Sequence, residues 1–222
     1  MTIEEAIKSR HTVRKYEDRR IPKEVADQLI ARIQEKNEKY DLNMKLVLDN
    51  TEAFGAVLKL ILAKGVRNYL VLAGKNAEDL DEKLGYCGTD IMLYAQTLGL
   101  NSWWVGGTFS KKGAKKNAQI ADDEKMTGII AIGYGAIQGV PHKSKRPEEI
   151  SCYNGNAPDW FTKGVEAVLL APTALNKQAF LIKGDQNKVS MTCENGDFSG
   201  TDLGIGKYHF EIGAGKENFE WI

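Results

Sequence analysis

Three residues near the N-terminus could bind a phosphate: Arg10, Thr12 and Arg14. In an extended backbone alternate side chains point the same way, so two guanidinium groups and a hydroxyl would converge. Guanidinium groups hold phosphate through paired, charge-assisted hydrogen bonds, and this spacing would suit that chemistry. The alternative is a pair of surface arginines after a helix, and by themselves these residues favour that alternative.

A second polar cluster lies late in the chain, within residues 171–178 (APTALNKQ). Pro172 should end the preceding helix, because proline cannot continue one. Thr173, Asn176 and Gln178 offer hydroxyl and amide groups that both donate and accept hydrogen bonds. Such groups suit a ring with several heteroatoms along its edge, and the alternative is a polar turn between helix and strand.

Two further segments could contribute to binding the same kind of ligand. The two glycines Gly106 and Gly107 follow a short strand predicted over residues 102–105, where they either let a planar ring approach the backbone or simply end the strand. The long loop predicted over residues 135–158 carries a basic cluster: Lys143, Lys145 and Arg146.

Two of these segments resemble signatures of one family. Residues 9–16 (SRHTVRKY) resemble the R-x-S/T-x-R/K-x-F/Y signature of the FMN-dependent nitroreductases, and residues 171–180 (APTALNKQAF) resemble their A-P-S-x-x-N-x-Q-P-W signature. The late position of the second signature is similar to a subgroup of nitroreductases with two half-sized copies in tandem. Residues 98–100, 104–109 and 131–134 also look like that subgroup. Threonine replaces the commoner serine in both signatures, and Ala179-Phe180 replaces Pro-Trp.

The resemblance implies an α+β fold, with a mixed or antiparallel sheet flanked by helices. The chain would be one nitroreductase-like unit, residues 1–222, built as a pseudo-two-fold from lobes 1–150 and 151–222. FMN would lie at the seam between the lobes. The residues expected to bind it are Arg10, His11, Thr12, Arg14, Val105, Gly106, Gly107, Lys143, Lys145, Arg146, Pro172, Thr173, Ala174, Asn176 and Gln178.

The activity implied is an FMN-dependent oxidoreductase. It would pass a hydride from NAD(P)H through flavin N5 to nitroaromatic or quinone-type acceptors by a ping-pong mechanism, with no catalytic residue from the protein. A non-catalytic flavin carrier or sensor is the alternative. Residues 153–159 contain no arginine to match the first signature. We therefore expect a monomer with one FMN, an internal pseudo-dimer, rather than a homodimer.

Composition excludes several other classes. The chain has 222 residues, with 30 basic and 30 acidic side chains, so no overall charge favours nucleic acid or an anionic membrane. Its three cysteines form no C-x-x-C pair and its three histidines have no ligand-like spacing, so we expect no metal site and a reducing cytoplasm. Gly133, Gly135 and Gly139 are spaced one residue too widely for a dinucleotide-binding loop.

The pattern of apolar residues predicts the elements that carry these segments. Thr2 and Glu5 form a capping box, Asn76 caps a long helix that runs to Leu98, and residues 111–116 and 122–124 are solvated faces. Residues 53–63 are either helix or strand. Helices are predicted from Pro22 and over 158–170 and 202–214, and strands over 44–48, 66–73 (ended by Gly74), 127–134, 179–183, 188–193 and 219–222. A faint internal match aligns residues 86–105 with residues 202–221.

Overall fold

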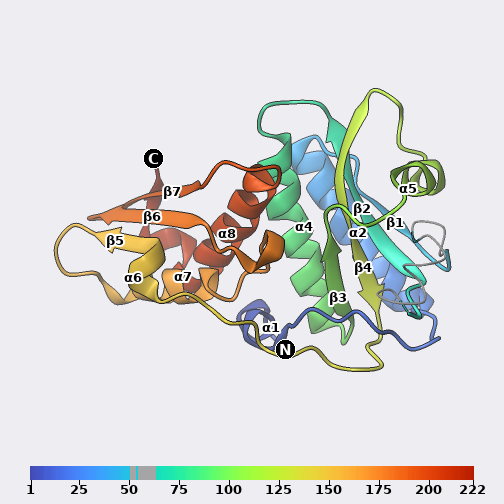
Figure 1. Ribbon diagram of the computed structural model, residues 1–222, viewed down its shortest axis with the longest axis horizontal. Coiled ribbons are helices and arrows are strands. Elements are labelled where there is room, and N and C mark those ends of the chain that lie inside the picture. Colours follow the sequence, from blue (N-terminus) through green and yellow to red (C-terminus); the bar gives the residue numbers. More distant parts are fainter. Residues whose placement is uncertain (51–53, 55–63) are drawn as a thin grey trace. The chain divides into compact units, whose positions relative to one another are not determined.

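The computed structural model describes residues 1–50, 54 and 64–222 (Figure 1). The segment predicted as helix or strand over residues 53–63 lies outside the described residues, apart from Phe54. The chain packs as two compact units. The N-terminal unit comprises Arg10–Leu80 and Asp90–Pro141, and the C-terminal unit comprises Met1–Ser9, Asp81–Thr89 and His142–Ile222. The α+β fold class is confirmed, and the division into lobes 1–150 and 151–222 stays a prediction.

An antiparallel sheet forms the centre of the N-terminal unit. Its strands lie in the order β1 (Lys45–Val47), β2 (Asn68–Lys75), β4 (Glu124–Gly133) and β3 (Asn101–Val105), as Figure 1 shows. Residues 69–73 and 128–133 are buried without alternation, because both faces of the two central strands are covered. Helices α2 (Lys23–Tyr40) and α5 (Lys111–Ala118) belong to this unit.

The C-terminal unit holds a mixed sheet. Strand β5 (Ser151–Tyr153) runs parallel to β6 (Phe180–Asp185), β6 is antiparallel to β7 (Lys188–Cys193), and β7 is parallel to β8 (Glu220–Trp221). Helices α1 (Ile3–Ser9), α6 (Pro147–Ile150), α7 (Asp159–Val168) and α8 (Ser199–Ala214) complete it, with η2 (Lys216–Asn218) before β8. Rings of Phe161, Phe210 and Phe219 meet in its core, with the ring centroids of Phe210 and Phe219 5.0 Å apart.

Among the described elements, the two sheets share an order along the chain. Around the sheet of the N-terminal unit, the elements follow one another as α2, β1, β2, α4 (Leu80–Thr97) and β3. Around the sheet of the C-terminal unit, they follow one another as α7, β6, β7, α8 and β8. In each set the first two strands pair antiparallel. Strand β3 runs parallel to β2 with β4 between them, whereas β8 runs parallel to β7 and pairs with it directly.

Most helices begin and end near their predicted bounds. The N-terminal capping box is present: the Glu5 N–H donates to Thr2 Oγ1 (3.2 Å) and the Thr2 N–H donates to Glu5 Oε2 (2.8 Å). The lysine-rich segment, predicted as a solvated face, forms α5. Its start is fixed by Ser110, whose hydroxyl oxygen accepts from the Gly113 N–H at 3.1 Å.

Two predicted boundaries were wrong. Gly74 does not end its strand, because its extended backbone pairs with Lys125 and β2 continues to Lys75. The long helix α4 begins at Leu80 after Asp79, three residues beyond the first position that an Asn76 cap would set.

The prediction of a loop over residues 135–158 also needs correction. A short helix, α6, starts after Arg146, where Pro147 and a capping box with Glu149 favour a helical turn. Strand β5 follows and exists because it pairs with β6.

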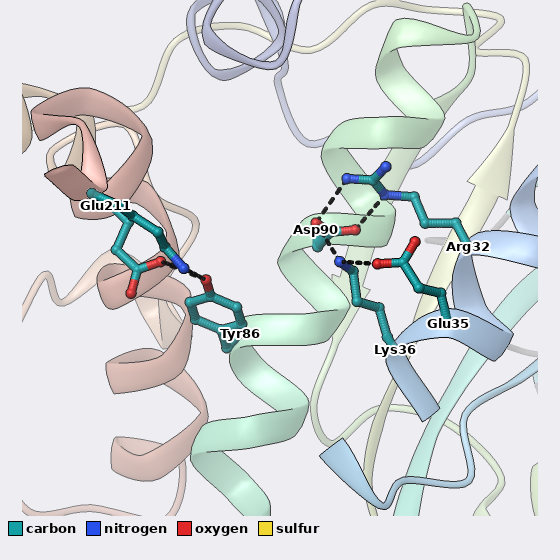
Figure 2. A network of polar contacts seen from close by, with 7 residues as sticks. Arg32, Glu35, Lys36, Tyr86, Asp90 and Glu211 are labelled. Carbon is teal, nitrogen blue, oxygen red and sulfur yellow. Dashed lines mark hydrogen bonds and ion pairs between the residues drawn. The ribbon is translucent and has the colours of Figure 1, made fainter. Parts of the chain in front are cut away.

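A polar network in the N-terminal unit joins α2 to α4 (Figure 2). The Asp90 carboxylate, with 5% of its side chain exposed, accepts two hydrogen bonds from Arg32, at 2.5 and 2.9 Å. Lys36 Nζ lies 3.5 Å from Asp90 and 3.1 Å from Glu35. Burial opposes the charge of Lys36, but the carboxylates of Asp90 and Glu35 outweigh it and raise the Lys36 pKa.

None of the helices in the described residues combines the length and apolar character that crossing a membrane requires.

Candidate functional site

The first signature runs alongside strand β3 in the N-terminal unit. Thr12 forms a parallel bridge with Ser102, and the Val13 N–H donates to the Ser102 carbonyl at 3.0 Å. Gly139 fixes the packing behind this segment, since a Cβ there would lie 2.7 Å from the Cβ of His11. The extended backbone expected for the signature is therefore present at its centre.

The two arginines of this signature have different surroundings. Arg14 is exposed, with its guanidinium carbon 5.6 Å from the centre of the Trp103 ring. Arg10 is only 4% exposed, and its Nε has no hydrogen-bond partner among the described residues. Burial lowers the pKa of Arg10 to about 10, with Tyr16 acting in the opposite direction. Within the described part of the chain, no carboxylate compensates this buried charge.

The glycine segment follows directly from the end of β3. Val105 is buried at 2% exposure and pairs with Ile129 of β4. The chain bends at Gly106 and Gly107, and a Cβ at Gly107 would meet no atom within 4 Å. The space beside Gly107 is therefore open.

The second signature forms a tight loop between α7 and β6 in the C-terminal unit. Ala171 is fully buried and Pro172 leads into η1 (Ala174–Asn176). Leu175, Asn176 and Gln178 all have positive φ, at 54°, 55° and 45°. Non-glycine residues in this conformation cost free energy, so surrounding contacts must hold the loop in this shape.

The basic cluster is tied to this loop. Asn176 Nδ2 donates to the Lys143 carbonyl at 2.8 Å, and the Lys145 N–H donates to Gln178 Oε1 at 2.7 Å. Lys145 Nζ donates to the Gln178 carbonyl at 3.0 Å. Arg146 instead forms an ion pair with Glu149 of the helix that it begins, and its Nε lies 3.1 Å from the Glu149 carboxylate.

The structure thus gathers the expected site residues into two groups. His11 and Thr12 lie beside β3 in the N-terminal unit, and Lys143, Lys145, Asn176 and Gln178 are joined by hydrogen bonds in the C-terminal unit. That both groups bind one flavin stays a prediction.

Sequence reasoning missed Asp202 in the first turn of α8. Both of its carboxylate oxygens accept from the Ala174 N–H at 3.1 Å, which fixes the start of η1. The residue is 7% exposed, and burial raises its pKa to about 6 against the opposing effects of the Ala174 N–H and Lys177. The signal in the sequence was an acidic residue in the first turn of a predicted helix. Acidic residues at this position are usually explained by their favourable interaction with the helix dipole.

We expect Asp202→Asn to stabilise the fold at neutral pH. The folded pKa of Asp202 lies above its ordinary value of 3.8, so the stability given by its neutral form is complete below pH 3.8 and is lost as the pH rises through about 6. The asparagine keeps an acceptor for Ala174 without the charge, so the gain should be about 1–2 kcal/mol near pH 7 and close to zero near pH 4. Urea unfolding at both pH values measures this, and an equal change at the two would contradict it.

Comparison with known proteins places this geometry in context. Residues 2–214 match the model of a family described as "Putative TM nitroreductase". The crystal structure of a putative nitroreductase from Thermotoga maritima is similar, with a TM-score of 0.71 and 23% identity over 98% of this chain and 85% of that one. No curated protein matches the chain.

Two further solved structures share the fold over part of the chain. One, from Bacteroides thetaiotaomicron, is named as a putative NADH dehydrogenase/NAD(P)H nitroreductase; its TM-score is 0.54, at 17% identity over 67% of this chain and 95% of that one. The other is a nitroreductase family protein from Streptococcus pneumoniae, with a TM-score of 0.54, at 14% identity over 67% of this chain and 98% of that one.

Proposed function

Since the chain belongs to the family described as "Putative TM nitroreductase", we propose that it is an FMN-dependent oxidoreductase. It takes a hydride from NAD(P)H and passes it to nitroaromatic or quinone-type acceptors. FMN, when bound, supplies the hydride-accepting and hydride-donating atom, N5. The protein itself has to bind and orient the donor, the acceptor and the flavin.

Arg10 is the observation that carries this proposal. A buried guanidinium with no carboxylate beside it in the described part of the chain is costly, and its Nε, unpartnered among those residues, is available to an incoming acceptor group. A phosphate, or the negative charge that accumulates near N1 and the C2 carbonyl of a reduced flavin, would provide the missing partner. The residues present therefore fit an anionic flavin.

The other expected site residues would contact different parts of the flavin, according to their chemistry. Thr12 and Arg14 would bind the phosphate and ribityl end with Arg10, assisted by the basic segment at Lys143 and Lys145. The open backbone at residues 105–107 would receive one edge of the ring, where N–H groups could donate to N5 or O4. Thr173 and Asn176 would bond the polar edge of the ring from the second signature.

The purified protein provides the test. We expect a flavin absorbance spectrum that bleaches with NAD(P)H and recovers with a nitro compound. Because donor and acceptor would use one ring face in turn, initial rates should follow ping-pong kinetics with parallel double-reciprocal lines. A spectrum that never bleaches would identify a flavin carrier or sensor. A colourless protein that FMN cannot reconstitute would exclude both.

We further propose that the chain is a monomer with one FMN and an internal pseudo-two-fold. The shared order of elements supports this, because α8 with β8 corresponds to α4 with β3. Extending the alignment of residues 86–105 with 202–221 by one residue makes Thr201 the counterpart of Gly85, and a Cβ at Gly85 would clash with the Thr201 carbonyl. A residue packs on its own counterpart where a two-fold axis passes between the two copies. Light scattering with flavin absorbance on the same sample tests this: a dimer that loses FMN on dilution would contradict it.

A further inference from the structure

We propose that Gln178 is a positioning residue that locks the basic segment, residues 142–145, to the loop of the second signature, and does not touch the flavin. The inference rests on the proposed function, because the segment it fixes is the one expected to hold the FMN phosphate. It changes the role of Gln178, which the family signature would place on the flavin edge.

The side chain of Gln178 is buried and its hydrogen-bonding groups are occupied. The residue is 1% exposed. Its Oε1 accepts from the Lys145 N–H at 2.7 Å, and its Nε2 donates to the Leu169 carbonyl at 2.9 Å. The same Nε2 lies 3.1 Å from Nε2 of His142.

The arrangement around Leu169 assigns the direction of the His142 contact. The Leu169 carbonyl lies 2.9 Å from three groups: Gln178 Nε2, Ser144 Oγ and His142 Nε2. A carbonyl oxygen has two lone pairs, which Gln178 and Ser144 fill. His142 Nε2 is then the acceptor for the second amide hydrogen of Gln178. Both N–H bonds of Gln178 end on the protein, and neither is left for a flavin heteroatom.

The backbone of Gln178 is fixed as well. Its N–H donates to Thr173 Oγ1 at 3.1 Å, and its carbonyl accepts from Lys145 Nζ at 3.0 Å. Together with the His142 contact and the bond from Asn176 to the Lys143 carbonyl, these contacts tie three residues of the segment 142–145 to the loop, and Ser144 bonds to the Leu169 carbonyl just before the loop. Lys143 keeps an exposed side chain on a backbone that is held from both sides.

The two roles of Gln178 predict different ligand affinities. Riboflavin carries the same ring as FMN but lacks the phosphate. A residue that bonds the ring edge contributes to both ligands equally, whereas one that only orders the phosphate-binding segment contributes to FMN alone. The ratio of the two dissociation constants therefore separates the roles, and a lower folded fraction would not change this ratio.

The test is fluorescence titration of the full chain with FMN and with riboflavin. In Gln178→Ala we expect the dissociation constant of FMN to rise about tenfold or more, since the Lys145 N–H loses its acceptor and His142 loses its bond to the loop. The riboflavin constant should stay within about twofold of the unchanged protein. Gln178→Glu is nearly isosteric and keeps the acceptor for Lys145, but it sets an oxygen against the Leu169 carbonyl. It should change the ratio in the same direction, and it serves if the alanine variant does not fold. Gln34→Ala, at an exposed glutamine of α2, is the matched control and should change neither constant.

A parallel loss of affinity for both ligands would show that Gln178 contacts the ring, and would overturn the inference. An unchanged FMN constant in both variants would overturn it too. Failure of the flavin binding on which the proposed function depends gives a different result, because the unchanged protein would then bind neither ligand.

Discussion

Arg10→Met should make the flavin-free protein more stable and at the same time weaken FMN binding. The charged form of Arg10 is disfavoured by burial, which lowers its pKa from 12.5 to about 10. A base whose pKa is lowered in the folded state costs stability wherever it is charged, and this cost applies in full at pH 7. Methionine fills a similar volume without the charge, so we expect a gain of about 1–3 kcal/mol in the free energy of unfolding.

The same substitution removes the cation that the phosphate or reduced flavin would meet. A charge-assisted hydrogen bond at a buried site contributes about 1.5–3 kcal/mol, so FMN affinity should fall by roughly 10- to 100-fold. Denaturant unfolding of the flavin-free protein and FMN titration measure the two effects separately.

Arg14→Met is the matched control for Arg10. Its guanidinium is exposed beside Trp103, so the substitution should lower FMN affinity without any gain in stability. A destabilised Arg10→Met variant would mean that the buried guanidinium has a stabilising partner, and the argument for an anionic ligand would fail.

Asp90→Ala should be the most destabilising single substitution considered for this chain. Asp90 is the carboxylate shared by Arg32 and Lys36, whose side chains are 28% and 12% exposed. Without it, Arg32 and Lys36 lose the buried carboxylate that they share, and Lys36 keeps the more exposed carboxylate of Glu35. Removing one partner of a buried ion pair costs about 3–5 kcal/mol, and the partial exposure of Arg32 places the expected loss near 3 kcal/mol.

Asp27→Ala provides the comparison for this network. Asp27 pairs with Lys23 on the same helix, but their side chains are 56% and 83% exposed. The loss there should be below about 0.5 kcal/mol, because exposed pairs are screened by solvent. Urea unfolding of both variants distinguishes the two, and equal losses would show that the Asp90 network contributes no more than a surface pair.

Local signals were sufficient for much of the fold. The capping box at Thr2 and Glu5, the apolar periodicity of α2 and the β-branched run in β4 depend on neighbouring residues, and each element formed where it was predicted. Elements that depend on distant partners were missed. Strand β5 is too short for a pattern of its own and forms because β6 pairs with it. Gly74 is typical of a strand end in isolation, yet a partner strand extends past it.

The candidate site, like the fold, could be predicted from the sequence only in part. The residue types of the two signatures were apparent from sequence, as was the extended backbone at Thr12. What could not be predicted was which groups are already used within the protein. The burial of Arg10, the contact of Asp202 with Ala174 and the saturation of Gln178 all depend on neighbours that the spacing of residues does not reveal.

The C-terminal unit is built from segments that lie far apart in the sequence, and this affects the order in which the chain can fold during synthesis. Helix α1 ends at Ser9 but packs against α8, which ends at Ala214. At typical translation rates of about 5–20 residues per second, roughly 10–40 s separate the two on the ribosome. During that interval α1 and the first turns of α4 lack the contacts that α8 gives them. The N-terminal unit ends at Pro141 and is complete much sooner. Its sheet can therefore form first, and helix α1, although synthesised before that sheet, is among the last elements to pack.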